Sequence, residues 1–158
     1  MSPINIKAWS TYLIIAIIGG QMIVKIYTDG ASRNNPGKSA SGYLVLSENG
    51  GKLLEKSFYN GIKTNNEAEY LAIIAALQEV AHAYGYGIGL ELYSDSRLAI
   101  SQLSGDFKVK SHELKKLHRE ALAILKKFDK YSLVNVPREN AQIVEVDANL
   151  NLLLDKYQ

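Results

Sequence analysis

Four acidic residues lie at positions where a carboxylate is expected to have a binding partner or a chemical function. Asp29 and Asp95 each follow directly on a short apolar run, and Asp147 lies among apolar residues at helical spacing. Glu69 begins another apolar stripe, whereas the favourable interaction of an acid with a helix N-terminus is enough to explain Glu67. Acids gathered in one place raise one another's pKa values, so a bound cation is their natural partner.

The rest of the composition indicates which cation that would be. The chain has no cysteine, and His112 and His118 are six residues apart, which is not the spacing that lets two imidazoles hold zinc. The ligands are then hard oxygen atoms, and the expected ion is magnesium or manganese. Two such ions about 4 Å apart suit in-line displacement at a phosphodiester, because one activates water and the other stabilises the leaving oxygen.

The first half of the chain predicts three antiparallel strands. The first strand begins at Met22 and ends at Asp29, where Gly30 allows a ligand or a second backbone to approach closely. Turn residues fill positions 32–37, and the next two strands, 42–47 and 52–59, are joined by an Asn-Gly hairpin signal. The central strand therefore delivers Asp29 to the edge of a sheet.

The second half alternates helices and strands. Thr64 and Glu67 form a capping box that opens a helix running to Gly85. Strand 90–94 ends at Asp95, and because a helix separates it from the first strand, it should run parallel to that strand and present Asp95 beside Asp29. The remaining predicted elements are a short helix at 96–103, an amphipathic helix at 110–129, a strand at 131–136 and a final helix at 143–157.

The 158 residues divide into an apolar N-terminal extension, residues 1–21, and one folded domain, residues 22–158. The extension carries no charge after Ala8, but two glycines and a glutamine interrupt its apolar run. We interpret it as dispensable, with Met22 as a natural start, and expect no stable membrane partner. A membrane or export role is the alternative.

Charge and cysteine content give weaker expectations about partners and location. The net charge is +2, but eight lysines and arginines face only three acids between Lys108 and Lys130. Such a run is usually a solvated helix face, and it can also hold nucleic-acid phosphates. The absence of cysteine fits a reducing compartment. We therefore expect a cytoplasmic protein.

Five short motifs, in this order, resemble the type 1 ribonuclease H family over residues 22–157. They are Tyr27-Thr28-Asp29-Gly30-Ala31-Ser32, Asn35-Pro36-Gly37, Thr64-Asn65-Asn66-Glu67-Ala68-Glu69, Tyr93-Ser94-Asp95-Ser96, and an acid that opens the last helix. The resemblance implies an α/β, ribonuclease H-like fold, with a mixed five-stranded sheet (three antiparallel strands, then two parallel) and helices on both faces. It also implies a monomer that cleaves the RNA strand of RNA/DNA hybrids.

The resemblance further assigns roles to individual residues. It selects Glu69 over Glu67 as a metal ligand and implies two magnesium or manganese ions held by Asp29, Glu69, Asp95 and Asp147. Asparagine side chains and backbone near Gly30 can reach 2′-hydroxyls, and lysines can hold phosphates without reading sequence. The expected substrate contacts are Gly30, Asn35, Thr64, Asn65, Asn66, Lys108 and Lys110, although Thr and Asn at a helix start are also ordinary caps.

The chain departs from the family pattern in two regions. Many family members have a histidine before the last helix, whereas residues 136–143 contain none, so Arg138 or Glu139 would take its place. Asn140 precedes Asp147 by seven residues rather than four, which predicts a lengthened start to the helix. The family's basic, tryptophan-bearing insertion is also absent. Two functions remain open: a nuclease on hybrids, with double-stranded RNA as a further substrate, and an accessory binding domain with weak catalysis.

Overall fold

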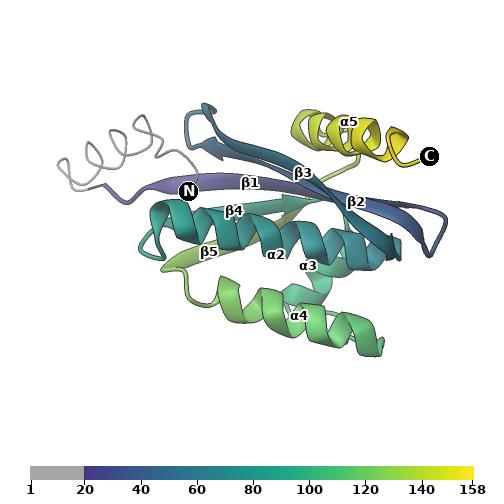
Figure 1. Cartoon of the computed structure of the whole chain (residues 1–158). Coiled ribbons are helices and arrows are strands. Elements are labelled where there is room, and N and C mark those ends of the chain that lie inside the picture. The colour runs from purple at the N-terminus through teal and green to yellow at the C-terminus, as the bar shows by residue number, and fades with distance from the viewer. Residues whose placement is uncertain (1–19) are drawn as a thin grey trace.

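A five-stranded mixed sheet forms the middle layer of the computed structural model, which describes residues 20–158 (Figure 1). β1 pairs antiparallel with β2 and parallel with β4, and β3 and β5 form the two edges. The predicted mixed sheet is therefore confirmed, with β1 at its centre. The strands are β1 (Ile23–Arg33), β2 (Gly37–Ser47), β3 (Lys52–Lys63), β4 (Gly89–Ser94) and β5 (Lys130–Asn135).

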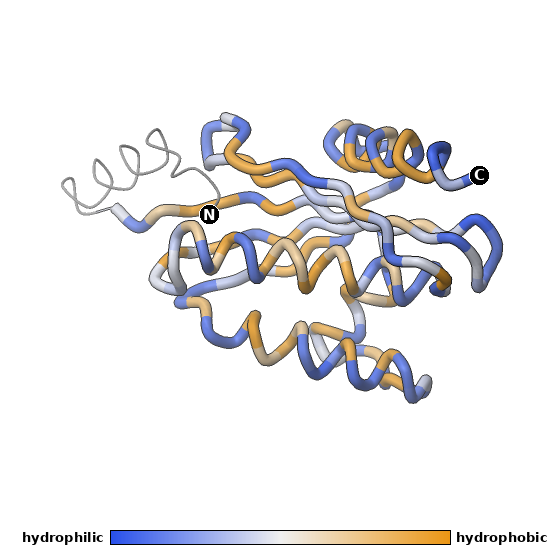
Figure 2. The backbone as a smooth tube through the Cα atoms, viewed as in Figure 1, coloured by the Kyte–Doolittle hydropathy of each residue, from blue (hydrophilic) through white to orange (hydrophobic). Residues whose placement is uncertain are grey.

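Helices cover both faces of the sheet, as predicted. Three of them, α2 (Asn65–Tyr84), α3 (Arg97–Leu103) and α4 (His112–Leu125), lie on one side, and α5 (Ala141–Asp155) lies alone on the other (Figure 1). Two apolar clusters result, and Figure 2 shows hydrophobic stretches along the strands and along the helices on both sides of the sheet. β1 supplies both, because Ile26 packs with α2 whereas Tyr27 packs with α5.

The central strand is longer than the sequence predicted. β1 does not end at Asp29 but continues to Arg33, because β2 pairs with it as far as Arg33 opposite Lys38. The turn that follows is accordingly confined to residues 34–36. Gly30 lies inside the strand, where an added Cβ would come within 2.3 Å of the Ala68 carbonyl carbon. The close approach that Gly30 permits is therefore made by the backbone of α2.

The predicted capping box at the start of α2 is present. The Thr64 side chain accepts a hydrogen bond from the Glu67 backbone N–H, and the Glu67 carboxylate accepts one from the Thr64 N–H. These two bonds satisfy donors that a helix N-terminus otherwise leaves free. They also fix the phase of α2, so that Glu69 turns toward the sheet.

The last two helices differ from prediction at their ends. α4 begins at His112, after the cap residue Ser111, and ends at Leu125 rather than at position 129. α5 begins at Ala141, two residues early, because the Asn140 side chain accepts hydrogen bonds from the first free backbone N–H groups. The lengthened segment before Asp147 is therefore helical.

The predicted extension, residues 1–21, lies almost wholly outside the described residues, and its boundary stays a prediction. Among residues 20–158, no helix combines the length and the apolar character needed to cross a membrane.

Candidate active site

Three carboxylates from three elements meet at the centre of the sheet. Oxygen atoms of Asp29, Glu69 and Asp95 all lie within 4.8 Å of one another. Asp29 lies in β1, and Asp95 follows β4 directly, where Ser94 pairs with Thr28. Glu69 reaches the same point because α2 rests its backbone on Gly30. The parallel pairing and the close helix contact together place the three acids as predicted.

Burial and mutual repulsion dominate the electrostatics of this group. Asp29 is 5% exposed and Glu69 is 9% exposed. Burial, with the neighbouring charge of Asp95, raises the pKa of Asp29 to about 7. Burial and the charges of Asp29 and Asp95 also raise the pKa of Glu69 well above its ordinary value, although the Gly30 N–H opposes this rise.

The donor set fits a hard divalent cation. All three side chains offer oxygen, and Oε2 of Glu69 is buried without a hydrogen-bond partner among the described residues. An unpaired buried carboxylate oxygen is costly unless a cation or a donor faces it. Magnesium and manganese bind such oxygens, whereas zinc sites are built mainly from cysteine and histidine. The three acids therefore form a candidate metal centre.

Asp147 approaches this centre from α5, the helix on the face of the sheet opposite α2. Its predicted place on the inward stripe is wrong, because Val146 occupies the core and Asp147 is exposed. Its charge nevertheless raises the pKa values of Asp29 and Asp95, so it faces the same centre from outside the close group. Glu145, the competing acid, points elsewhere and pairs with Lys52 of β3 at 2.9 Å.

Arg138, in the loop before α5, influences the candidate metal centre through its charge, which acts on Asp95. Burial raises the pKa of Asp95, and the positive charge of Arg138 opposes that rise. Arg138 is itself exposed. The positive charge of Arg138 therefore acts on one acid of the centre, Asp95, from an exposed position.

The predicted substrate residues at the start of α2 form an interlocked group. The Asn35 side chain accepts a hydrogen bond from the Asn65 backbone N–H at 3.0 Å, and the Asn65 side chain accepts one from Ser32 at 2.8 Å. Thr64 serves as the helix cap. The side-chain NH₂ groups of Asn35 and Asn65 have no partner among the described residues, and Asn66 is exposed. This group therefore has both a structural role and free donors, while the backbone of Gly30 lies covered by α2.

Lys108 and Lys110 lie exposed on the segment between α3 and α4. Sequence reasoning missed the residue that connects this segment to the centre, the buried Gln102. Its side-chain NH₂ donates to the Lys108 carbonyl at 3.4 Å, and its oxygen accepts from the Tyr70 hydroxyl at 2.6 Å. Tyr70 follows Glu69 directly in α2. The only signal in the sequence was a polar residue among the apolar positions of a helix.

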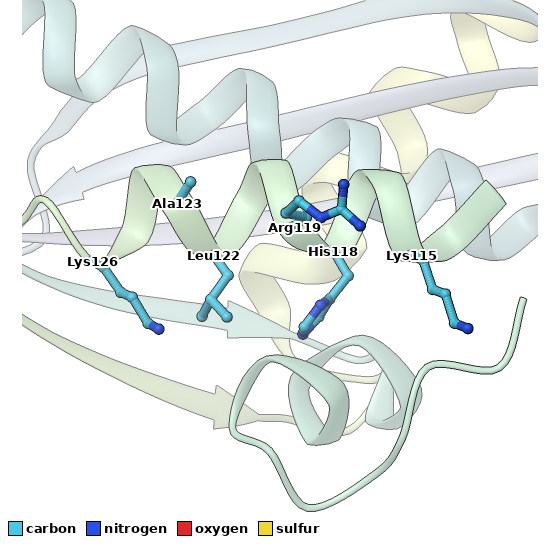
Figure 3. A pocket seen from close by; sticks show the side chains of 6 residues that line it. All are labelled: Lys115, His118, Arg119, Leu122, Ala123 and Lys126. Carbon is cyan, nitrogen blue, oxygen red and sulfur yellow. The ribbon is translucent and has the colours of Figure 1, made fainter. Parts of the chain in front are cut away.

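A separate basic surface runs along α4. Figure 3 shows the side chains of its lining residues projecting from successive turns of the helix. These residues include three cations and no acid, and His118 lies 3.0 Å from the Gln102 carbonyl. The surface therefore has the positive charge to bind phosphates, but its lining residues include no carboxylate that could hold a metal ion. It is lined by Lys115, His118, Arg119, Leu122, Ala123 and Lys126.

Comparison with known proteins agrees with this arrangement. The family profile described as "Reverse transcriptase-like" matches residues 27–150. The crystal structure of RNase H1 from the halophilic archaeon Halobacterium salinarum NRC-1 is similar to the chain, with a TM-score of 0.78 and 39% identity, over 85% of this chain and 98% of that one. The chain belongs to the type 1 ribonuclease H family.

Two further relatives of this ribonuclease H chain are informative. The curated Ribonuclease HI of Halobacterium salinarum is 40% identical over 126 residues, which are 80% of this chain, and the chain spans 62% of the length of that relative. LC11-RNase H1, isolated from compost, has been solved in complex with an RNA/DNA hybrid. Its TM-score is 0.74 and its identity 35%, over 83% of this chain and 99% of that one.

Proposed function

We propose that the chain is a metal-dependent endoribonuclease that cleaves the RNA strand of RNA/DNA hybrids. The observation that carries this proposal is the meeting of Asp29, Glu69 and Asp95, with one buried Glu69 oxygen lacking a partner among the described residues. Membership of the ribonuclease H family supports the reaction, and the hybrid bound to LC11-RNase H1 supports the substrate.

We infer that the centre holds two magnesium or manganese ions. When bound, such ions supply an activated water and stabilise the charge on the leaving oxygen. Asp29, Glu69 and Asp95 provide the fixed ligand oxygens, because three packed elements hold them before any ion arrives. Asp147 adds a fourth carboxylate from the solvent side.

The residues around the centre suit a duplex that contains RNA. The free side-chain NH₂ groups of Asn35 and Asn65, with exposed Asn66 beside them, can donate to 2′-hydroxyls and to base edges in a shallow minor groove. Lys108 and Lys110 can hold backbone phosphates in any sequence. Because all of these groups belong to one chain, the site needs no second subunit, and we propose that a monomer acts on hybrids and on double-stranded RNA.

Arg138 is proposed to replace the loop histidine of other family members. Its charge acts on Asp95, whereas no charge effect of the neighbouring Glu139 on the three acids is found among the described residues. A guanidinium stays protonated at working pH, so Arg138 would steer and release phosphate groups rather than transfer a proton.

A strand-specific cleavage assay tests the proposal. The RNA strand and the DNA strand of one hybrid carry different labels, and single-stranded RNA and double-stranded RNA of the same sequence serve as comparison substrates. We expect magnesium-dependent cuts in the RNA strand of the hybrid and none with Glu69→Gln. Tight hybrid binding without cleavage would favour the accessory binding domain instead.

A further inference from the structure

Asp147 is exposed on α5, yet its carboxylate is held by a neighbour on the same helix. The side-chain NH₂ of Asn151, one turn later, donates to the Asp147 carbonyl oxygen at 2.9 Å and to its Oδ1 at 3.1 Å. An exposed aspartate otherwise moves among several side-chain rotamers. The contact with Asn151 restricts this motion and engages one of the two carboxylate oxygens, Oδ1.

The orientation of the Asn151 amide is fixed in turn by Arg33. Nη2 of Arg33 donates to the Asn151 carbonyl oxygen at 3.2 Å and to its Oδ1 at 3.4 Å. The same nitrogen pairs with Asp155 at 2.6 Å, which anchors the guanidinium on α5. A guanidinium only donates, so Asn151 must turn its oxygen toward Arg33. Its NH₂ group is then left to face Asp147.

Arg33 is the last residue of β1, the strand that also carries Asp29. A continuous set of hydrogen bonds therefore runs from the central strand through Arg33 and Asn151 to Asp147. Sequence reasoning gave neither residue a role.

We propose that Asn151 is a positioning residue that aims the Asp147 carboxylate at the metal centre, and that Arg33 sets the orientation of its amide. The inference rests on the proposed metal-dependent function. Groups that hold a metal ligand in place affect metal affinity by about tenfold to a hundredfold when removed. We expect an effect at the lower end of this range, because Asp147 lies outside the buried group.

The test is the affinity of the full chain for Mn²⁺ alone, measured by isothermal titration calorimetry without nucleic acid. Asn151→Ala should weaken the most affected Mn²⁺ site by about tenfold. The matched control is Asn149→Ala on the same helix, because Asn149 donates to Glu55 of β3 rather than to Asp147. Alanine is the best helix former, so both substitutions suit α5. The control should bind Mn²⁺ as the parent protein does.

Two further measurements separate positioning from mere packing. Arg33→Met should weaken Mn²⁺ binding in the parent protein but add little to Asn151→Ala, because the two residues act in series. Thermal unfolding in EDTA reports the stability that each variant loses apart from any metal. In hybrid cleavage, Asn151→Ala should lower kcat and leave KM unchanged.

Several outcomes would overturn the inference. Equal Mn²⁺ affinities of the parent protein and Asn151→Ala would show that Asp147 needs no anchor. Equal losses in Asn151→Ala and Asn149→Ala would show that only the docking of α5 matters. A parent protein that binds no Mn²⁺ would refute both the proposed metal centre and this inference. If Asn151→Ala weakens Mn²⁺ binding and Asn149→Ala does not, but the parent protein cuts no hybrid, only the proposed reaction would be refuted.

Discussion

The buried side and the exposed side of the candidate metal centre hold their acids in different ways. On the buried side, Asp29, Glu69 and Asp95 are positioned by strand pairing and by backbone contact between α2 and Gly30. On the exposed side, α5 carries Asp147, and polar side-chain contacts tie this helix to β1 and β3. The buried acids are thus placed by the fold itself, whereas the fourth acid depends on exposed hydrogen bonds.

The largest effect is expected on the buried side. Glu69→Gln should abolish hybrid cleavage, because it removes the charge of a buried ligand that no other described residue can replace. Glu67→Gln is the matched control two residues away. Glutamine also serves in a capping box, so that variant should keep its fold and most of its activity. A severe loss with Glu67→Gln and a mild one with Glu69→Gln in a steady-state assay would reverse the assignment.

A smaller effect is expected on the exposed side. Asp147→Asn should lower turnover strongly, by about a hundredfold, since small misplacements in a catalytic group cost that much. Some activity should remain with manganese, because three acids can still hold one ion. Glu145→Gln should change little, because Glu145 pairs with Lys52. If Glu145→Gln proves the more damaging change, the fourth ligand has been misassigned.

This difference also explains what the sequence could predict. Asp29 and Asp95 each end an apolar run, and the strand-helix-strand order predicts that the two strands carrying them pair in parallel. The proximity of the two acids therefore follows from local pattern and topology. Glu69 follows from the phase that the Thr64 capping box sets. The continuation of β1 beyond Asp29 was missed, because pairing with β2 overrides the local stop signal at Gly30.

The orientation of side chains on α5 was harder to predict, because the spacing of apolar residues does not decide which of two consecutive helix residues faces the core. The apolar stripe placed Asp147 inward, whereas Val146 occupies the core. The contacts of Arg33 with Asn151 and Asp155 join residues more than a hundred positions apart. No local pattern in the sequence indicates such contacts.

A third effect concerns the stability of the metal-free protein. The pKa of Asp29 is raised to about 7, so the folded chain binds a proton that the unfolded chain, with an Asp pKa near 3.9, has lost. Stability should therefore fall as pH rises from about 4 to 7, by on the order of 2 kcal/mol. Thermal unfolding in EDTA should show this slope, and Asp29→Asn should reduce it. Asp106→Asn, in an exposed loop, is the control and should keep the slope.

The smallest effect is expected at the surface lysines. Removing Lys108 and Lys110 together should raise KM a few-fold and leave kcat unchanged, because phosphate contacts add affinity without touching the reacting bond. The dependence of binding on salt should weaken by about one unit of log–log slope per lost contact. Lys127→Ala is a suitable control, since Lys127 lies over Tyr86 beyond the far end of α2. Unchanged salt dependence in the double variant would exclude these lysines from the interface.

Metal dependence of hybrid cleavage tests the central claim most directly. The full chain is freed of metal with EDTA, incubated with hybrid labelled on the RNA strand, and then supplied with increasing magnesium or manganese. We predict no cleavage in EDTA, full recovery with either ion in the parent protein, and no recovery with Glu69→Gln. Cleavage that persists in EDTA, or recovery in Glu69→Gln equal to that of the parent protein, would contradict the account.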